Sequence, residues 1–390
     1  MESKYMFLLQ LAAILLAAHV AGLISERLKQ PAVLGQIIIG LILGAGLMEK
    51  TELINQFAEI GVVFLMFIAG LETDVKELLE SGKSSSIIAF GGIVVPAVLV
   101  FVGMMLIIPS HDKTVALFLG IVATATSVSI SVQTLREIGK LRTKQGVMIL
   151  GAAIIDDVVG IVLLTLLVGM VSPNATSSIF VVIFKIVAFF VVVYGVGFAV
   201  VKILKKMDAK FIVEDKVIIW AIVICLILAF LSEEFGVAAI TGAYFAGLIF
   251  SMTKHQHQIA HEVGKISGFM FTPVFFVGIG MDINIMEALS AMGVGSILIV
   301  LGSIGKIIGC GVGAKLTGFN SAESLQIGVG MVPRAEVAII VANLGLKMSI
   351  LTQKDMAATI LMVLVTTLIT PSLLKWTFHR NEKLHEINAD

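Results

Sequence analysis

The sequence predicts an all-α polytopic membrane protein, and three observations carry this expectation. Hydrophobic residues make up 58% of the 390 residues and charged residues only 14%, whereas soluble domains are roughly half apolar. The apolar residues gather in runs that are long enough for a helix to cross a bilayer. Because a bilayer core offers no water to backbone amides, and the short alternating segments of a barrel are not apparent, these runs are expected to be helices.

Apolar runs between charged or Pro/Gly-rich breaks predict about thirteen transmembrane helices. The first run is of full span length and its leading residues include both Glu2 and Lys4, so it is interpreted as a helix and not as a signal peptide. The predicted helices cover residues 5–24, 31–48, 55–71, 84–108, 114–135, 146–170, 178–201, 217–231, 236–252, 264–281, 289–314, 322–346 and 355–377.

The distribution of basic residues predicts the orientation in a bacterial inner membrane. Of the 27 Lys and Arg residues, 19 lie in or beside the C-terminus and the loops that follow odd-numbered helices, and 5 lie at the N-terminus or in the other loops. Loops rich in Lys and Arg face the cytoplasm. The N-terminus is therefore expected outside and the C-terminus inside. A net charge of zero and the lack of a basic tract give no indication of a nucleic-acid partner.

The longest basic connector, residues 201–216, follows the seventh predicted helix and leaves six helices on each side. This arrangement predicts two six-helix repeats joined by a linker helix at about 178–202. Pairing the halves by a shift of seven helices inverts the topology of one repeat relative to the other.

Two adjacent carboxylates, Asp156 and Asp157, lie in the predicted helix 146–170. Each charge costs on the order of 3 kcal/mol in a membrane helix, so such residues usually have a function. A carboxylate that is only neutralised by a basic neighbour is the alternative. Neighbouring helical residues point about 100° apart, so one aspartate can meet a protein partner while the other faces a cavity.

Lys306 lies in the predicted helix 289–314, about eight residues from its cytoplasmic end. Snorkelling toward the interface is the alternative, but the depth of roughly 12 Å weakens it. An ammonium in apolar surroundings needs a carboxylate, so Lys306 is expected to reach the aspartate pair. Gly305, Gly309 and Gly313 recur every four residues and allow a neighbouring backbone to approach closely.

Two further helices carry polar or helix-breaking residues in mid-span. Helix 114–135 contains Thr126 and Ser127 in a cluster of hydroxyls, for which ordinary small-residue packing is the alternative. Helix 322–346 contains Pro333 between glycines and a charged pair, and is predicted to be interrupted. The two are counterparts under the seven-helix shift, and paired interrupted segments indicate the binding site of a transporter. Arg334 and Glu336 flank the second interruption and are interpreted as structural or gating residues.

The polar positions of four separate helices fall at one depth. Counted from the cytoplasmic helix ends at 1.5 Å per residue, Thr126, Asp156, Lys306 and Pro333 lie roughly 12–17 Å deep. This is near the middle of a hydrocarbon core of about 30 Å. Such convergence indicates one shared site.

The motifs FIAGLETD, ATATSVSISVQTLRE, GAAIIDDVVG and GMVPRAEVA, together with Lys306, occur in this order over residues 67–338. With them the chain resembles the cation:proton antiporter-2 family. The resemblance implies an NhaA/NapA-like fold with crossed broken helices, assembled as a homodimer. It implies a scaffold domain at about 1–80 and 215–282 and a mobile core domain at about 84–171 and 286–378. Many relatives have Gly where this chain has Ala335.

The resemblance also implies the roles of the site residues. Asp157 resembles the carboxylate that binds the cation, Asp156 the partner of Lys306, and the Thr126–Ser127 backbone the neighbouring ligands. The implied function is exchange of cytoplasmic Na⁺, or Li⁺ or K⁺, for external protons by an elevator-type motion, without a cofactor. From the count of charges in the site we expect electrogenic exchange.

Other functions that use buried charges fit the sequence less well than antiport. An intramembrane aspartyl protease needs its two aspartates on different helices, whereas here they are adjacent in one, so an enzyme is not expected. A passive channel would use rings of carbonyls or charges. A Kef-like gated K⁺ efflux or K⁺/H⁺ exchange protein on the same fold remains the alternative.

Overall fold

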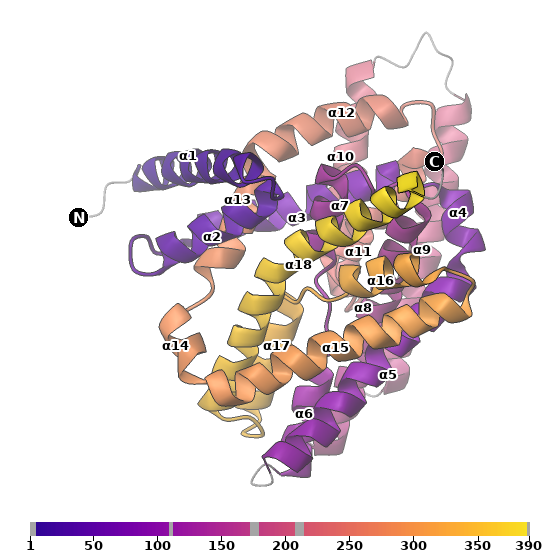
Figure 1. Ribbon diagram of the computed structural model, residues 1–390. Helices are drawn as coiled ribbons and strands as arrows, with labels where there is room; N and C mark the ends of the chain where they lie inside the picture. Colours follow the sequence, from indigo (N-terminus) through magenta and orange to yellow (C-terminus); the bar gives the residue numbers. More distant parts are fainter. Residues whose placement is uncertain (1–4, 109–111, 172–178, 207–213, 388–390) are drawn as a thin grey trace. The chain divides into compact units, whose positions relative to one another are not determined.

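The structure, a computed structural model, describes residues 5–108, 112–171, 179–206 and 214–387, and within these ranges every regular element is a helix (Figure 1). In chain order they are α1 (Met6–Arg27), α2 (Ala32–Gly44), α3 (Glu52–Glu72), α4 (Val75–Glu80), α5 (Gly82–Ile107), α6 (Lys113–Val122), α7 (Val128–Glu137), α8 (Lys144–Val171), α9 (Ile179–Lys206), α10 (Glu214–Glu234), α11 (Ala239–Ser251), α12 (Gln256–Ile266), a π-helical turn η1 (Ser267–Phe271), α13 (Thr272–Met281), α14 (Ile285–Ser290), α15 (Met292–Leu316), α16 (Ser321–Gly330), α17 (Glu336–Lys347) and α18 (Gln353–Ile387).

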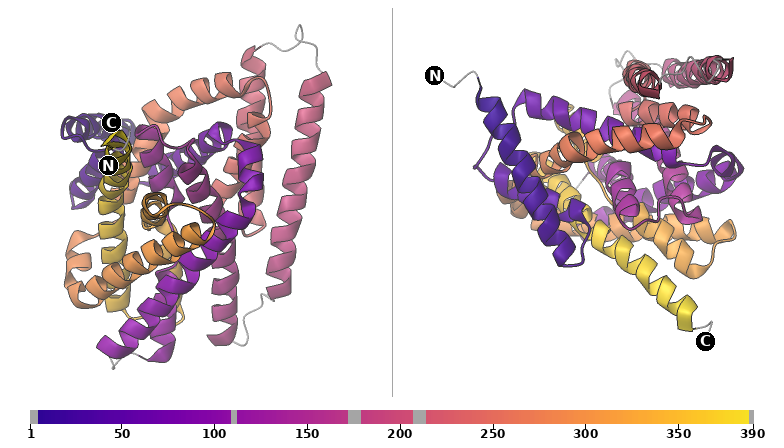
Figure 2. Two further views of the ribbon diagram at one scale, coloured as in Figure 1. Left: turned by 45° about the vertical axis from the view of Figure 1, so that its right-hand side comes forward. Right: turned by 90° about the horizontal axis from the view of Figure 1, so that it is seen from above.

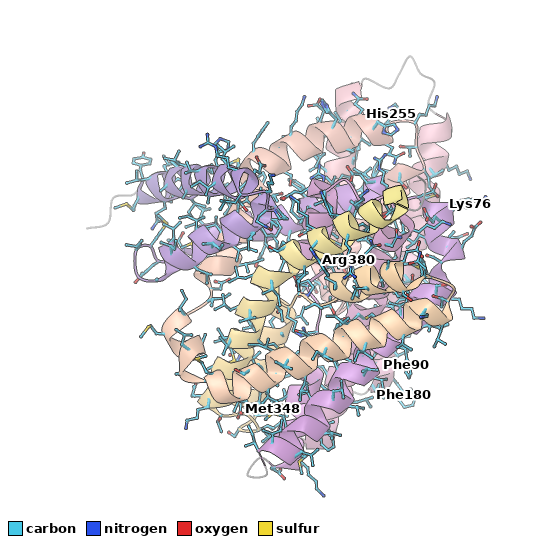
Figure 3. The ribbon with its side chains drawn as sticks, viewed as in Figure 1. Lys76, Phe90, Phe180, His255, Met348 and Arg380 are labelled. Carbon is cyan, nitrogen blue, oxygen red and sulfur yellow. The ribbon has the colours of Figure 1, made fainter. Side chains whose placement is uncertain are left out.

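Nine helices in the described part of the chain are long and apolar enough to cross a membrane. Many large apolar side chains on these helices are exposed. Phe90 on α5 is 67% exposed and Phe180 on α9 is 80% exposed, and both project away from the ribbon (Figure 3). Extended apolar surface of this kind is unfavourable in water and marks contact with a membrane or a partner.

The predicted interruption of residues 322–346 is confirmed, because they form α16 and α17, and residues 114–135 likewise form two helices, α6 and α7. The helices differ from the predicted runs in two ways. The run predicted at 264–281 starts earlier, at Gln256, and contains the π-helical turn. Two short helices, α4 and α14, were not predicted, because six residues leave no apolar run; their first turns are capped by the side chains of Asp74 and Asn284.

The chain divides into two compact units, of which the first contains residues 1–50, 81–156 and 276–390. Within it α5 and α15 lie along each other (Figures 1 and 2). Gly91 of α5 faces the backbone of Gly309, and Gly305 of α15 faces Pro96, so closely that a Cβ atom on any of these glycines would overlap the opposing backbone. This close packing fixes the position of Lys306, which lies on the same helix.

In the first unit, hydrogen bonds also connect the turn between α1 and α2 to α7 and α18. Glu137, the last residue of α7, accepts hydrogen bonds from the backbone N–H groups of Ala32 at 2.6 Å and Val33 at 3.3 Å. These are the first residues of α2, where a carboxylate is favourable beside the positive end of the helix dipole. From α18, Ser372 donates to the Gln30 side chain.

The second unit contains residues 51–80 and 157–275, and α3 and α11 pack together in it. Gly70 of α3 and Gly247 of α11 let the two backbones approach. The buried Tyr244 hydroxyl donates to Thr73 Oγ1 at 3.2 Å, at the end of α3. The long helix α9 packs on α11 and α10.

Candidate functional site

The first interruption, residues 123–127, separates α6 from α7 and leaves helix-end groups in the protein interior. Thr124, Thr126 and Ser127 are 3–5% exposed, so their polar atoms need partners inside the protein. The N–H of Ser127 donates to the carbonyl oxygen of Pro333 at 2.7 Å. This bond ties the first interruption directly to the second.

The second interruption, residues 331–335, separates α16 from α17. Pro333 lies within it, as expected for a residue that cannot donate to a helical hydrogen bond. Ser131 of α7 donates to the Gly330 carbonyl at the end of α16, which is a second link between the two interrupted helices. Ala335 has a φ of −147°, outside the left-handed region, so the sign of φ does not require glycine at this position.

Asp156 of α8 and Lys306 of α15 form a buried ion pair beside the first interruption. Lys306 is 0% and Asp156 3% exposed. Lys306 Nζ lies 3.1 Å from Asp156 Oδ2 and 3.2 Å from Oδ1, and it also donates to the Thr124 carbonyl at 2.7 Å. Thr126 Oγ1 donates to Asp156 Oδ2 at 2.7 Å. Both charges are thus paired and hydrogen-bonded, which a buried ion pair requires.

Arg334 is the second buried cation of the site and is 0% exposed. Its guanidinium donates from Nε and Nη2 to the Ala123 carbonyl, from Nη1 to the Val332 carbonyl and from Nη2 to the Gly302 carbonyl. Ala123 is the C-cap of α6, where the carbonyls form the negative end of the helix dipole. Arg334 therefore neutralises the end of α6 and joins it to α15.

Asp157 follows Asp156 on α8 and is half-buried, so it is more accessible than its neighbour. Its side chain is turned about 100° from that of Asp156 around the helix axis. The side chain of Glu336 lies outside the described residues. The structure therefore brings Asp156, Lys306, Thr126, Pro333 and Arg334 into one cluster, with Ser127 joined through its backbone.

Sequence reasoning missed the backbone acceptors of the two cations. Lys306 was expected to meet a carboxylate, but its shortest bond in the site is to the Thr124 carbonyl. Every residue has a backbone carbonyl, so the sequence does not show which carbonyl will accept a hydrogen bond. The only available hint was the position of Thr124 in a segment that pairs with an interrupted helix.

The fold and this site define a multi-pass helical membrane protein with a buried charged cluster at two interrupted helices. The sequence matches the family described as "Sodium/hydrogen exchanger, transmembrane" over residues 14–380. The chain therefore belongs to the sodium/hydrogen exchanger family.

Named relatives agree with this assignment. The chain is 39% identical to the Na⁺/H⁺-K⁺ antiporter GerN of Bacillus cereus over 97% of this chain and 98% of the relative. It is 42% identical to the probable Na⁺/H⁺ antiporter GerT of the same organism over 96% of this chain and 100% of the relative. Its fold resembles that of the sodium proton antiporter MjNhaP1 of Methanocaldococcus jannaschii, with a TM-score of 0.68 at 18% identity over 95% of this chain and 96% of the other.

Proposed function

We propose that this chain is a secondary active antiporter that exchanges cytoplasmic Na⁺ for external protons, with the carboxylates of α8 as the shared binding groups. Family membership and the names of the relatives GerN and GerT support antiport. The observation that carries the proposal is the buried Asp156–Lys306 pair beside two interrupted helices that are bonded to each other. Ionisable groups inside a membrane span mark ion pathways and proton relays.

The proposed chemistry is a competition at Asp157. A carboxylate holds a proton or a hard cation that prefers oxygen ligands, but not both at once. Asp157 is the more accessible of the two aspartates, so it is assigned to the transported ion. Asp156, already engaged by Thr126 and Lys306, keeps the site in place. The hydroxyl and carbonyl oxygens of residues 124–127 would complete the cation's ligands.

Coupling requires that the site opens to one side at a time. The proposed motion is of an elevator type, in which a core domain at about 84–171 and 286–378 moves against a scaffold at about 1–80 and 215–282 in a homodimer. The charge pattern of the loops supports an external N-terminus and a cytoplasmic C-terminus. The interrupted helices can transmit such a motion, because they hold each other through Ser127 and Ser131.

K⁺ is the second candidate cation. The name of GerN includes K⁺, and selectivity among cations with oxygen ligands depends on cavity size and flexibility. A transport assay therefore has to compare Na⁺ with K⁺. A K⁺-only response would favour the Kef-like alternative over Na⁺ exchange.

Decay of an imposed pH gradient in proteoliposomes tests the proposal. Wild-type protein should dissipate the gradient on addition of Na⁺, in a series that also includes Li⁺, K⁺ and Rb⁺. Asp157→Asn should abolish the response, because an amide can neither release a proton nor supply a negative ligand. Asp112→Asn is the matched control: it changes an exposed aspartate at the N-cap of α6 and should exchange like wild type. Wild-type exchange by Asp157→Asn would refute the assignment of the ion to this carboxylate.

The cycle is further proposed to move net charge. If two protons load the cluster and one monovalent cation replaces them, one charge crosses the membrane in each cycle, worth about 2.3 kcal/mol per 100 mV. Arg334 keeps its charge throughout and does not alter this difference. Solid-supported-membrane recordings should show a transient current on Na⁺ addition. Robust exchange without current, unaffected when the membrane potential is collapsed, would establish an electroneutral cycle.

A further inference from the structure

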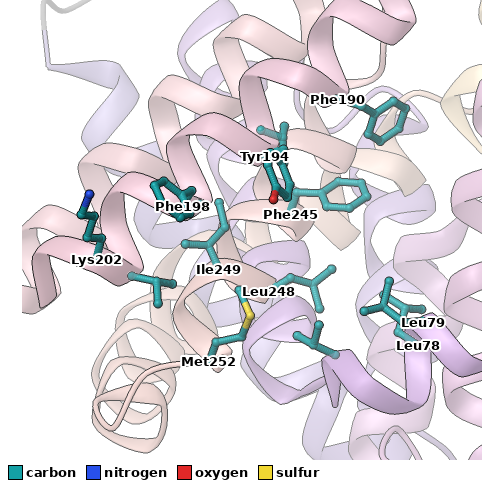
Figure 4. Close-up of a pocket in the computed structure, with 14 residues that line it drawn as sticks. Leu78, Leu79, Phe190, Tyr194, Phe198, Lys202, Phe245, Leu248, Ile249 and Met252 are labelled. Atoms are coloured by element: carbon teal, nitrogen blue, oxygen red, sulfur yellow. The ribbon is translucent and has the colours of Figure 1, made fainter. Parts of the chain in front are cut away.

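A groove in the second unit, away from the charged cluster in sequence and chemistry, has no role in the exchange described above. It has a volume of about 690 Å³ and runs between α4, α9 and α11. Along α9 its wall includes Phe190, Tyr194, Phe198 and Lys202, which recur every four residues and so share one face of the helix. Figure 4 shows Phe190 at one end of this row and Lys202 at the other.

The lining is apolar except at one end. Leu79 of α4, Leu248 of α11 and Met252 just after α11 line the other walls, and Lys202 is the one charged residue among the lining side chains. The groove is open to the surroundings, because Tyr194 is 78% and Phe198 62% exposed. Lys202 Nζ lies 5.4 Å from the centre of the Phe198 ring, so the aromatic row positions the ammonium at the rim.

The length of the groove matches one leaflet of a bilayer. From Phe190 to Lys202 the helix rises by roughly 18 Å, and half of a hydrocarbon core is about 15 Å. An apolar chain that enters from the middle of the membrane would therefore end near the ammonium.

The charges around the rim favour an anionic group. Lys202 opens the most basic connector of the chain, residues 201–216, which has five lysines and three acidic residues. The acidic residues of α4, Glu77 and Glu80, are turned away from the side of that helix that carries Leu78 and Leu79. Basic pockets between transmembrane helices on the cytoplasmic side are suited to anionic lipid headgroups.

We propose that the groove between α4, α9 and α11 binds one anionic phospholipid of the cytoplasmic leaflet, with an acyl chain along Phe190, Tyr194 and Phe198 and the headgroup phosphate at Lys202. The lipid seals the open side of α9 against α11. Binding of this lipid does not depend on whether the chain transports Na⁺, K⁺ or neither, so its test can fail or succeed independently of the exchange assay.

The test is lipid binding to the purified full chain in detergent, measured by native mass spectrometry with dioleoylphosphatidylglycerol and dioleoylphosphatidylcholine. Wild type should bind the anionic lipid about 5-fold more tightly, as expected for one lysine near an anionic headgroup. Lys202→Gln should remove this preference and leave the binding of phosphatidylcholine unchanged. Lys83→Gln, at an exposed lysine on the same predicted face of the membrane, should behave like wild type.

Two glycines of α9 provide a test variant and a matched control for the apolar part of the groove. A Cβ at Gly197 lies 3.1 Å from the flexible Ile249 side chain in the groove, whereas a Cβ at Gly195 meets nothing within 4 Å. Gly197→Leu should weaken the binding of both lipids roughly 10-fold, whereas Gly195→Leu should leave the binding of both unchanged. If Gly197→Leu lowers the melting temperature, Phe198→Ser serves instead, because Phe198 is exposed and its loss should not disturb folding. Wild-type affinity in these groove variants, or equal binding of the two lipids by wild type, would overturn the proposal.

Discussion

The two interrupted segments play different parts around the two buried cations. The α6–α7 interruption supplies carbonyl acceptors for both cations, those of Ala123 and Thr124, whereas the α16–α17 interruption supplies one of the cations itself, Arg334. Lys306 lies between a carbonyl and a carboxylate, while the described contacts of Arg334 are to carbonyls. The difference indicates that the cations have separate tasks: Lys306 is linked to a group that can take up a proton, and Arg334 to helix ends that cannot.

The largest effect is expected for Lys306→Gln, which leaves Asp156 buried without its cation. Breaking a buried ion pair costs about 3–5 kcal/mol, so the melting temperature should fall strongly. Adding Asp156→Asn should restore much of the loss, because the double variant has no uncompensated charge. Scanning fluorimetry of the purified protein measures this. A double variant as unstable as Lys306→Gln would show that the two residues are not coupled.

Arg334→Lys should cost less, about 2 kcal/mol, for a different reason. A lysine keeps the charge but lacks the planar fork that serves three carbonyls, and buried carbonyls without donors are destabilising. Because this loss does not involve a carboxylate, Asp156→Asn should not relieve it. The same melting experiment on the single and double variants decides the question. Relief by Asp156→Asn would mean that Arg334, like Lys306, acts through the aspartate.

A smaller, pH-dependent effect is expected at Glu137, at the far end of α7 from the interruption. Desolvation raises the pKa of Glu137, partly opposed by hydrogen bonds from Gln133, Ala32 and Val33, and the Glu26 charge raises the pKa further. Because the side chain also reaches solvent, its desolvation is incomplete. A raised pKa means that the folded protein binds this proton more tightly than the unfolded chain does.

The stability that this proton contributes is therefore fully present below the ordinary pKa of 4.5 and is lost as the pH rises through the raised value. Glu137→Gln should remove this loss. The melting temperature of wild type relative to Glu137→Gln should be highest near pH 4 and decline toward neutrality. Melting curves between pH 4 and pH 8 measure the difference. An opposite trend would show that the hydrogen bonds to α2 outweigh desolvation.

The smallest effect is expected from the histidines near α12, which lie outside both interruptions. His255 precedes the helix at its exposed end (Figure 3), and His257 and His261 are exposed on it. If pH acts through competition at the carboxylates of α8, replacing all three histidines with glutamine should leave the pH profile of exchange unchanged. Loss of pH dependence at unaltered apparent cation affinity would assign them a sensing role.

Much of this arrangement follows from the chemistry of residue types. Asp156 and Lys306 could be expected to meet because neither charge is tolerated alone in a membrane, and Pro333 predicted an interruption because it lacks an N–H. The position of Arg334 beside Pro333 indicated a structural or gating role, but its hydrogen bonds to the carbonyls of Ala123 and Gly302 could not be predicted. Those contacts depend on how far α6 extends, which no residue type specifies. The helix start at Gln256 was missed because five of the seven residues 256–262 are polar.

The glycine contacts between α5 and α15 restrict how Lys306 can travel. Gly91, Gly305 and Gly309 each receive opposing backbone where no side chain would fit, so sliding one helix along the other by a residue would drive side chains into these positions. The two helices have to move as one rod during any transport cycle. Random mutagenesis followed by selection for function should therefore recover no larger residues at the glycines that recur every four residues along the α5–α15 interface.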